Sequence, residues 1–170
     1  MYLPKQVNSI CFTGHRELSG IEKKLLAIRL SKILTKLARD HGLCDCYAGG
    51  AIGFDTVAAL TVISVKRRIS ELKLHLILPC ENQEKSWNEE QKTAYYLIKE
   101  QADSVRVLAP FFYNGCMQMR NRELLESADL CIAYLRSGTS TGGSLNTVLQ
   151  ATKLGIPVIN LADTESEELL

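Results

Sequence analysis

Short, continuous apolar runs alternate with longer segments of helical periodicity along this chain of 170 residues. The apolar runs lie at residues 9–13, 44–48, 72–78, 105–108, 130–134 and 157–161. Most of them are apolar throughout and do not alternate with polar residues, which is typical of strands that helices cover on both faces. Repeated strand–helix units therefore predict an α/β protein with a doubly wound, mostly parallel sheet and helices on both faces, a Rossmann-like arrangement.

In the segments between these runs, apolar residues recur at the spacing that is typical of helices. Ser19 can cap a first helix that ends at His41-Gly42. Its apolar positions recur at helical spacing and include Ile21, Leu25, Ile28 and Leu37. Further helices are expected over 54–65, 86–101, 117–127 and 144–154. No repeat, linker or low-complexity segment interrupts the pattern, so we expect one domain over residues 1–170 with a loose acidic tail at 163–170.

Composition narrows the classes of function. The formal net charge is +1, with 46% hydrophobic and 23% charged residues, so the sequence favours neither a dedicated nucleic-acid surface nor a membrane surface. No apolar stretch is long enough for a membrane span and no signal peptide precedes the first strand, which predicts a cytoplasmic, reduced protein. The Cys44-x-Cys46 pair has no second pair to complete a zinc site, so we expect no metal and buried free thiols. The sequence leaves homo-oligomerisation open.

Glycine-rich segments follow three of the predicted strands. In a doubly wound sheet, ligands bind beyond the carboxyl ends of the strands, so these segments carry the functional information. They run over 13–16, 49–55 and 137–144, and Arg120 on a predicted helix can point toward the same edge. The candidate ligand-binding residues are Thr13, Gly14, His15, Arg16, Gly49, Gly50, Gly53, Asp55, Arg120, Gly138, Thr139, Ser140, Gly142, Gly143 and Ser144.

Glycines at the start of helices let the backbone approach an anion, and the helix N-terminus adds its positive end. Hydroxyl groups of the third segment add donors, and Arg16 can form forked hydrogen bonds to a phosphate. These features predict a small-molecule, phosphate-bearing, nucleotide-like ligand, and no cofactor is assigned with certainty. The alternative is that the glycines serve tight turns and that Arg16 and Arg120 are surface charges.

His15 can be a general base, a phosphate donor or a packed loop residue. No Ser-His-Asp order, HExxH or Walker motif accompanies it, and no GxGxxG follows the first strand. The sequence therefore supports neither nucleophilic hydrolysis, nor ATP-driven work, nor an ordinary NAD dehydrogenase, and the catalytic residues are unassigned.

At these loops the chain resembles the SLOG superfamily, which unites the DNA-processing protein DprA/Smf with the LOG cytokinin-activating hydrolases. The resemblance is greatest to the YpsA-like branch. It rests on the segments Thr13 to Arg16, Gly49 to Asp55, Met119 to Arg122 and Gly138 to Ser144, which occur in the expected order.

The resemblance implies a nucleotide-derived ligand of the ADP-ribose, NAD-like or nucleoside monophosphate type. It offers three roles, ranked as ligand-binding or sensing protein, LOG-like nucleotide N-glycosidase (phosphoribohydrolase), and DprA-like nucleic-acid-binding module. LOG enzymes use an arginine, which Arg120 matches, and a glutamate after the glycines, which this chain lacks beyond Gly142-Gly143. Because glycosidic cleavage normally needs a carboxylate, the departure favours binding over hydrolysis. Low aromatic content and near-zero net charge argue against nucleic-acid binding.

Overall fold

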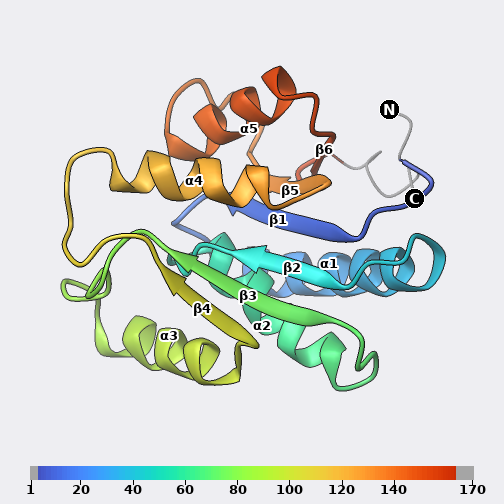
Figure 1. The fold of residues 1–170 in the computed structure, drawn as a ribbon, viewed down its shortest axis with the longest axis horizontal. Coiled ribbons are helices and arrows are strands. Elements are labelled where there is room, and N and C mark those ends of the chain that lie inside the picture. Colours follow the sequence, from blue (N-terminus) through green and yellow to red (C-terminus); the bar gives the residue numbers. More distant parts are fainter. Residues whose placement is uncertain (1–3, 164–170) are drawn as a thin grey trace.

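The computed structural model describes residues 4–163, and it contains six strands and five α-helices in alternation (Figure 1). The strands are β1 (Ser9–Gly14), β2 (Asp45–Ala48), β3 (Lys73–Leu78), β4 (Ser104–Val107), β5 (Leu130–Tyr134) and β6 (Val158–Asn160). The helices are α1 (Gly20–Asp40), α2 (Phe54–Lys66), α3 (Glu89–Gln101), α4 (Cys116–Glu126) and α5 (Gly143–Lys153). All predicted elements are therefore present, although α3 begins later than residue 86 because Asn88 caps it through the Gln91 N–H.

The strands form one parallel sheet in the order β4-β3-β2-β1-β5-β6. This confirms the predicted Rossmann-like α/β fold. The chain adds β2, β3 and β4 on one side of β1 and then returns to add β5 and β6 on the other side. The order reverses between β1 and β5, and such a reversal is where open parallel sheets bind their ligands.

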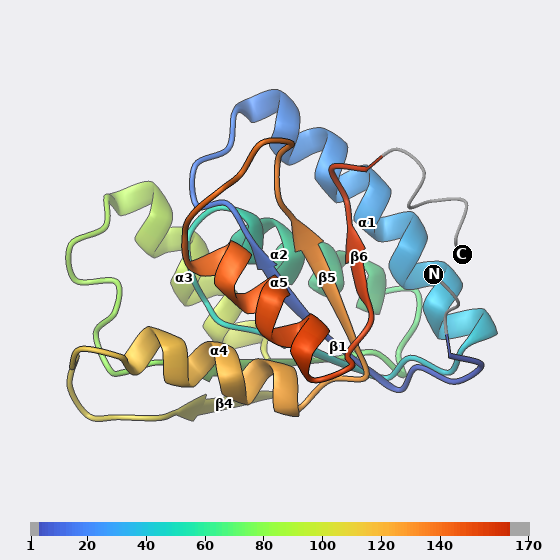
Figure 2. The same ribbon diagram turned by 90° about the horizontal axis from the view of Figure 1, so that it is seen from above.

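Helices cover both faces of the sheet (Figures 1 and 2). Buried side chains of α1, α2 and α3 form the larger core with Ile10 and Phe12 of β1. Those of α4 and α5 form the smaller core on the opposite face with Cys11. Because successive strand residues point to opposite faces, β1 contributes to both cores, and with β2 it lies in the middle of the sheet.

Helix α1 begins as predicted. Ser19 accepts a hydrogen bond from the Glu22 N–H at 3.2 Å, and Glu22 accepts one from the Ser19 N–H at 2.7 Å. The core face of α1, however, consists of Leu26, Leu30, Ile33, Leu34 and Leu37. Of the apolar positions used to predict the helix, Leu37 is buried whereas Ile21, Leu25 and Ile28 lie on the exposed face.

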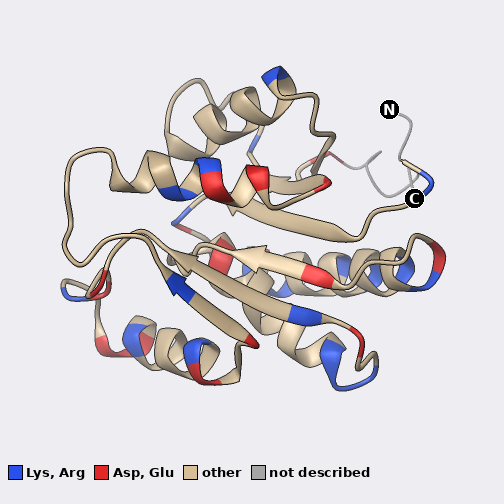
Figure 3. Ribbon diagram, in the orientation of Figure 1, with Lys and Arg blue, Asp and Glu red and all other residues tan. Residues whose placement is uncertain are grey.

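Five of the six cysteines are buried free thiols, as expected. The expectation is wrong for Cys44, which is exposed and lies just before β2 instead of within it. Lysines, arginines and acidic residues are interspersed over the helices in Figure 3, without a face of one sign in that view. Within residues 4–163, no helix is both long and apolar enough to cross a bilayer. Most of the predicted acidic tail, from residue 164 onward, lies outside the described residues.

Candidate functional site

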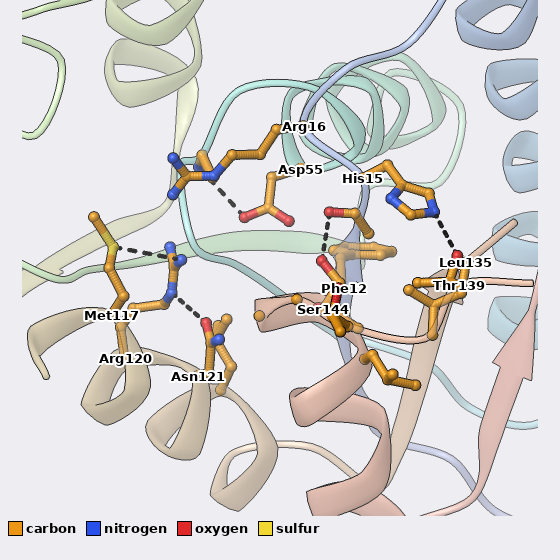
Figure 4. A pocket seen from close by; sticks show the side chains of 18 residues that line it. Phe12, His15, Arg16, Asp55, Met117, Arg120, Asn121, Leu135, Thr139 and Ser144 are labelled. Atoms are coloured by element: carbon orange, nitrogen blue, oxygen red, sulfur yellow. Dashed lines mark hydrogen bonds between the residues drawn. The ribbon is translucent and has the colours of Figure 1, made fainter.

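A cavity of about 260 Å³ lies where the strand order reverses, at the carboxyl ends of β1 and β5 (Figure 4). Its walls come from the loop after β1, the starts of α2 and α5, the loop after β5, and α4. The three glycine-containing segments singled out in the sequence therefore meet at one edge of the sheet.

The N-terminus of α5 forms one wall. Its N-cap residue, Gly142, provides no side-chain hydrogen bond to the first turn, and Gly143, Ser144 and Leu145 of that turn line the cavity. A Cβ atom built on Gly142 or Gly143 would have no neighbour within 4 Å, so the space in front of this turn is open. The Ser144 hydroxyl instead donates to the Gly14 carbonyl at 2.7 Å and joins α5 to the end of β1. N–H groups at a helix N-terminus that lack a side-chain cap can bind an anion, and those of α5 lie beside this cavity.

Arg120 and Asp55 are the two buried charged residues of the candidate site. The Arg120 guanidinium donates to the Gly49 carbonyl oxygen and, through Nε, to Asn121 Oδ1 at 2.8 Å. Asp55 Oδ2 accepts the N–H groups of Gly49 and Ala51 at 3.1 and 3.3 Å. Burial raises the pKa of Asp55, while Arg120 and these N–H groups oppose the rise. Burial lowers the pKa of Arg120, and Asp55 opposes this shift. The two charges therefore offset each other beneath the cavity.

Arg16 differs from Arg120 because it is exposed. It lines the same cavity, and its positive charge acts on both Asp55 and Arg120. Among the described residues, no hydrogen bond or ion pair engages its guanidinium. Arg16 thus adds a positive charge to a cavity in which the two buried charges, those of Asp55 and Arg120, offset each other.

His15 holds two loops together. Its Nε2 accepts the backbone N–H of Arg136 at 3.0 Å and lies 3.3 Å from Thr139 Oγ1. Burial, followed by the charge of Arg136, lowers the pKa of His15, which favours the neutral ring. A neutral ring that accepts at Nε2 carries its proton on Nδ1. Because the accepting nitrogen is already engaged, the arrangement supports a packed loop residue over a general base.

Three glycines allow close packing beneath the cavity. A Cβ on Gly14 would lie 2.7 Å from the Phe54 ring, one on Gly49 would lie 2.6 Å from the Arg120 guanidinium carbon, and one on Gly53 would overlap the Arg16 backbone. Gly53 also has a φ of 82°, which favours glycine. At these three positions the structure supports the alternative reading of the sequence, in which the glycines serve tight turns and close packing. Gly142 and Gly143, in contrast, face open space.

The candidate residues therefore separate into two groups. Those that line the cavity are Thr13, Gly14, His15, Arg16, Asp55, Arg120, Thr139, Gly142, Gly143 and Ser144. Those that do not line it are Gly49, Gly50, Gly53, Gly138 and Ser140.

Sequence reasoning missed the apolar lining of Phe12, Leu124 and Leu135, since an apolar residue in a strand or helix carries no signal of a site. It also left Asn121 unassigned, although this residue follows Arg120 directly and orients it. The described part of the chain holds no cluster of three or more His, Cys, Asp or Glu side chains suited to a metal ion.

Comparison with known proteins identifies related sequences. A family model described as the YspA SLOG family matches residues 10–153, a range that contains every candidate site residue. A UPF0398 protein of Bacillus pumilus is 33% identical over 133 residues, which cover 73% of this chain and 71% of that protein. A UPF0398 protein of Brevibacillus brevis is 35% identical over 82 residues, covering 47% of this chain and 44% of that protein. One from Oenococcus oeni is 27% identical over 116 residues, covering 64% and 62%. The last two alignments thus span less than two thirds of the relatives' own lengths.

Proposed function

The chain belongs to the YspA SLOG family, and from this premise we propose that it binds or senses a nucleotide-derived ligand through a phosphate group. The family match confirms the resemblance to the YpsA-like branch of the SLOG superfamily. The proposed site is the cavity at the carboxyl ends of β1 and β5.

One observation carries the proposal. The uncapped first turn of α5 and the unpaired Arg16 face the same small cavity. The helix N-terminus supplies a partial positive charge and free N–H donors, and Arg16 supplies a full charge with forked donors. Since Asp55 and Arg120 offset each other, the balance in the cavity is positive. A phosphate group is an anion that accepts hydrogen bonds both from helix N-terminal N–H groups and from an arginine.

A second candidate function is nucleotide N-glycosidase, and Asp55 is the observation that favours it. Asp55 is a carboxylate that lines the cavity, whereas Glu81 and Glu84, which follow β3, do not line it. Asp55 nevertheless uses Oδ2 for two backbone N–H groups and lies beside Arg120. A carboxylate engaged in this way orders the loop after β2, which supports binding over cleavage.

The nucleic-acid-binding alternative ranks third. Single-strand binding relies on a basic groove with stacking aromatic side chains. The aromatic rings that line the cavity are those of Phe12 and His15, and both belong to its packed walls.

The experiment that tests the proposal is substitution of Gly143 by valine. Wild-type protein is expected to bind AMP, ADP-ribose or NAD, measured by thermal shift and calorimetry, because a ligand of the folded state raises the melting temperature. Gly143→Val places a branched side chain in the phosphate space and should abolish binding without unfolding the protein.

Gly20→Val is the matched control. Gly20 is also the first residue of a helix, α1, and a Cβ there also meets nothing within 4 Å, but Gly20 does not line the cavity. The control should bind as wild type does. Undiminished binding by folded Gly143→Val protein would place the site elsewhere and refute the proposal.

A further inference from the structure

Three polar side chains from β2, β3 and β4 form a chain of hydrogen bonds on one face of the sheet. Nε2 of His75 lies 2.8 Å from Asp45 Oδ1, and Nδ1 of the same ring lies 2.7 Å from Ser104 Oγ. An aspartate, a histidine and a serine in contact in this order are the parts of a nucleophilic triad. Triads are recognised by geometry and not by sequence position, and here each residue comes from a different strand.

The register of the sheet brings these residues together. His75 is paired with Tyr47 of β2 on one side and with Ser104 of β4 on the other, so the three side chains share one face. Asp45 precedes Tyr47 by two residues and therefore points to the same face. The Tyr47 ring stacks on the imidazole, with centroids 4.9 Å apart and an interplanar angle of 26°. The stacking and the two hydrogen bonds together fix the orientation of the His75 ring.

The serine of this group is open to solvent. His75 lies on the same face as Ile77, which belongs to the smaller core beneath α4 and α5. Helix α5, however, packs mainly against β1, β5 and β6, and no helix of the described chain crosses in front of β2, β3 and β4 in Figure 1. Ser104 is exposed, whereas the His75 side chain is only 18% exposed. A substrate can therefore reach the hydroxyl group, while the ring behind it is largely shielded from water.

The hydrogen bonds determine where the proton of the neutral imidazole lies. A carboxylate can only accept a hydrogen bond, so Nε2 carries the proton and donates it to Asp45. Nδ1 then has a free lone pair and accepts the hydroxyl proton of Ser104. An adjacent base that accepts its proton is what activates a serine hydroxyl group as a nucleophile.

Donors for a developing negative charge lie next to Ser104. Arg106 follows two residues later on β4, so its side chain lies on the same face. Its guanidinium donates to Glu123 of α4 and is 56% exposed. In addition, β4 is an edge strand, and an edge strand leaves part of its backbone N–H groups without a partner strand. Guanidinium and backbone N–H groups are the donors that stabilise an oxyanion in acyl transfer.

We propose that Ser104 is the nucleophile and His75 the general base of a second site, which hydrolyses small carboxylic esters, with Asp45 as the positioning residue. The Ser104 oxygen bonds to the carbonyl carbon of the ester as its proton passes to Nδ1 of His75. The ester C–O bond then breaks, and the leaving alcohol takes that proton. Water releases the acid from acyl-Ser104 by the same path. None of the three residues lines the cavity at β1 and β5, so this activity is separate from nucleotide binding.

The test uses an alkyl fluorophosphonate as the probe and p-nitrophenyl acetate as the ester. In the labelling step the serine oxygen bonds to phosphorus, fluoride leaves and His75 takes the proton. Peptide mass spectrometry of labelled wild-type protein should locate the phosphonate on Ser104. The folded Ser104→Ala variant should lose both the label and the enzymatic release of p-nitrophenol.

Two further variants test the roles of the other residues through the rate of labelling, which a purely structural hydrogen bond would not change. His75→Gln removes the base and should slow labelling by at least about 100-fold. Asp45→Asn no longer holds the required tautomer and should slow it by at least about tenfold. His41→Gln is the matched control, because the His41 ring lies beside the Pro4 carbonyl oxygen at 3.2 Å and is remote from Ser104 in the sheet. Its labelling rate should equal that of wild type.

Absence of label on Ser104 in folded wild-type protein would overturn the inference. Labelling of Ser104 at an unchanged rate in folded His75→Gln and Asp45→Asn proteins would overturn it as well, since the three residues would then form only a structural bridge between strands. Should Ser104→Ala fail to fold, the position of the label in wild type and the rate in His75→Gln decide the question. Circular dichroism establishes the folding of each variant.

Discussion

The guanidinium of Arg120 lies against the backbone of Gly49, which is 71 residues earlier in the chain, and donates a hydrogen bond to its carbonyl oxygen. The contact is so close that Gly49 has no room for a Cβ, which would lie 2.6 Å from the guanidinium carbon. The Gly49 N–H donates to Asp55 on the same turn. Gly49 thus joins the buried cation to the buried carboxylate beneath the cavity.

Gly49→Ala is expected to destabilise the protein by about 2 kcal/mol or more, because the methyl group displaces a buried guanidinium from its acceptor. The measurement is urea denaturation followed by circular dichroism. Gly20→Ala is the control, since a Cβ at Gly20 meets open space at the start of α1. Equal stability of the two variants would contradict the structural role given to Gly49.

Glu22 is expected to make folding stability depend on acid pH. The Ser19 N–H, together with the hydroxyl groups of Tyr134 and Ser19 and the Arg136 guanidinium, lowers the pKa of Glu22 to about 2. A lowered pKa in the folded state stabilises the protein above the unfolded pKa of about 4.3, and that stability is lost as pH falls toward 2.

The measurement is the free energy of unfolding of wild type and Glu22→Gln between pH 2 and pH 6. Wild type should be the more stable above about pH 5, and the difference should shrink toward pH 2. A difference that stays constant over this range would show that the Glu22 carboxylate contributes nothing through its ionisation.

His15 is expected to leave ligand binding independent of pH near neutrality. Because burial and the charge of Arg136 lower the pKa of His15 below its usual value, the neutral ring predominates from pH 7 to pH 8 and the charge in the cavity changes little. The dissociation constant of ADP-ribose, whose pyrophosphate does not titrate there, should change less than about twofold across this range. A larger change that disappears in His15→Ala would instead assign His15 a charged role toward the ligand.

Purified protein is expected to bind AMP, NAD or ADP-ribose without releasing the base. In the sequence, Asn146 lies near the position where the resemblance to the LOG hydrolases implies a carboxylate, and an amide is no general base near neutral pH. Base release is followed by chromatography over many turnovers. Steady release that is lost in folded Asp55→Asn or Arg120→Ala protein would overturn the sensing proposal in favour of the N-glycosidase.

Local patterns in the sequence were enough to predict the helices and strands of this protein and the kind of sheet that the strands form. Hydrophobic periodicity is a property of neighbouring residues, so the six strands, the five helices and the Ser19 cap of α1 were predictable from local patterns. The parallel sheet followed from the alternation of strands and helices, and the edge that carries the candidate site followed from the parallel sheet.

The surroundings of each residue, by contrast, could not be predicted from local patterns and are known from the folded structure alone. Gly49 and Gly143 both occur in glycine pairs next to a helix, yet one supports Arg120 and the other opens on the cavity. Likewise, Ile28 and Leu30 belong to the same helical pattern, yet Leu30 is buried and Ile28 is exposed. Turn geometry and hydrophobic periodicity depend on residues that are neighbours in the sequence. The side chains that pack against a given glycine or leucine come from elements that are distant in the sequence, so local patterns do not reveal them.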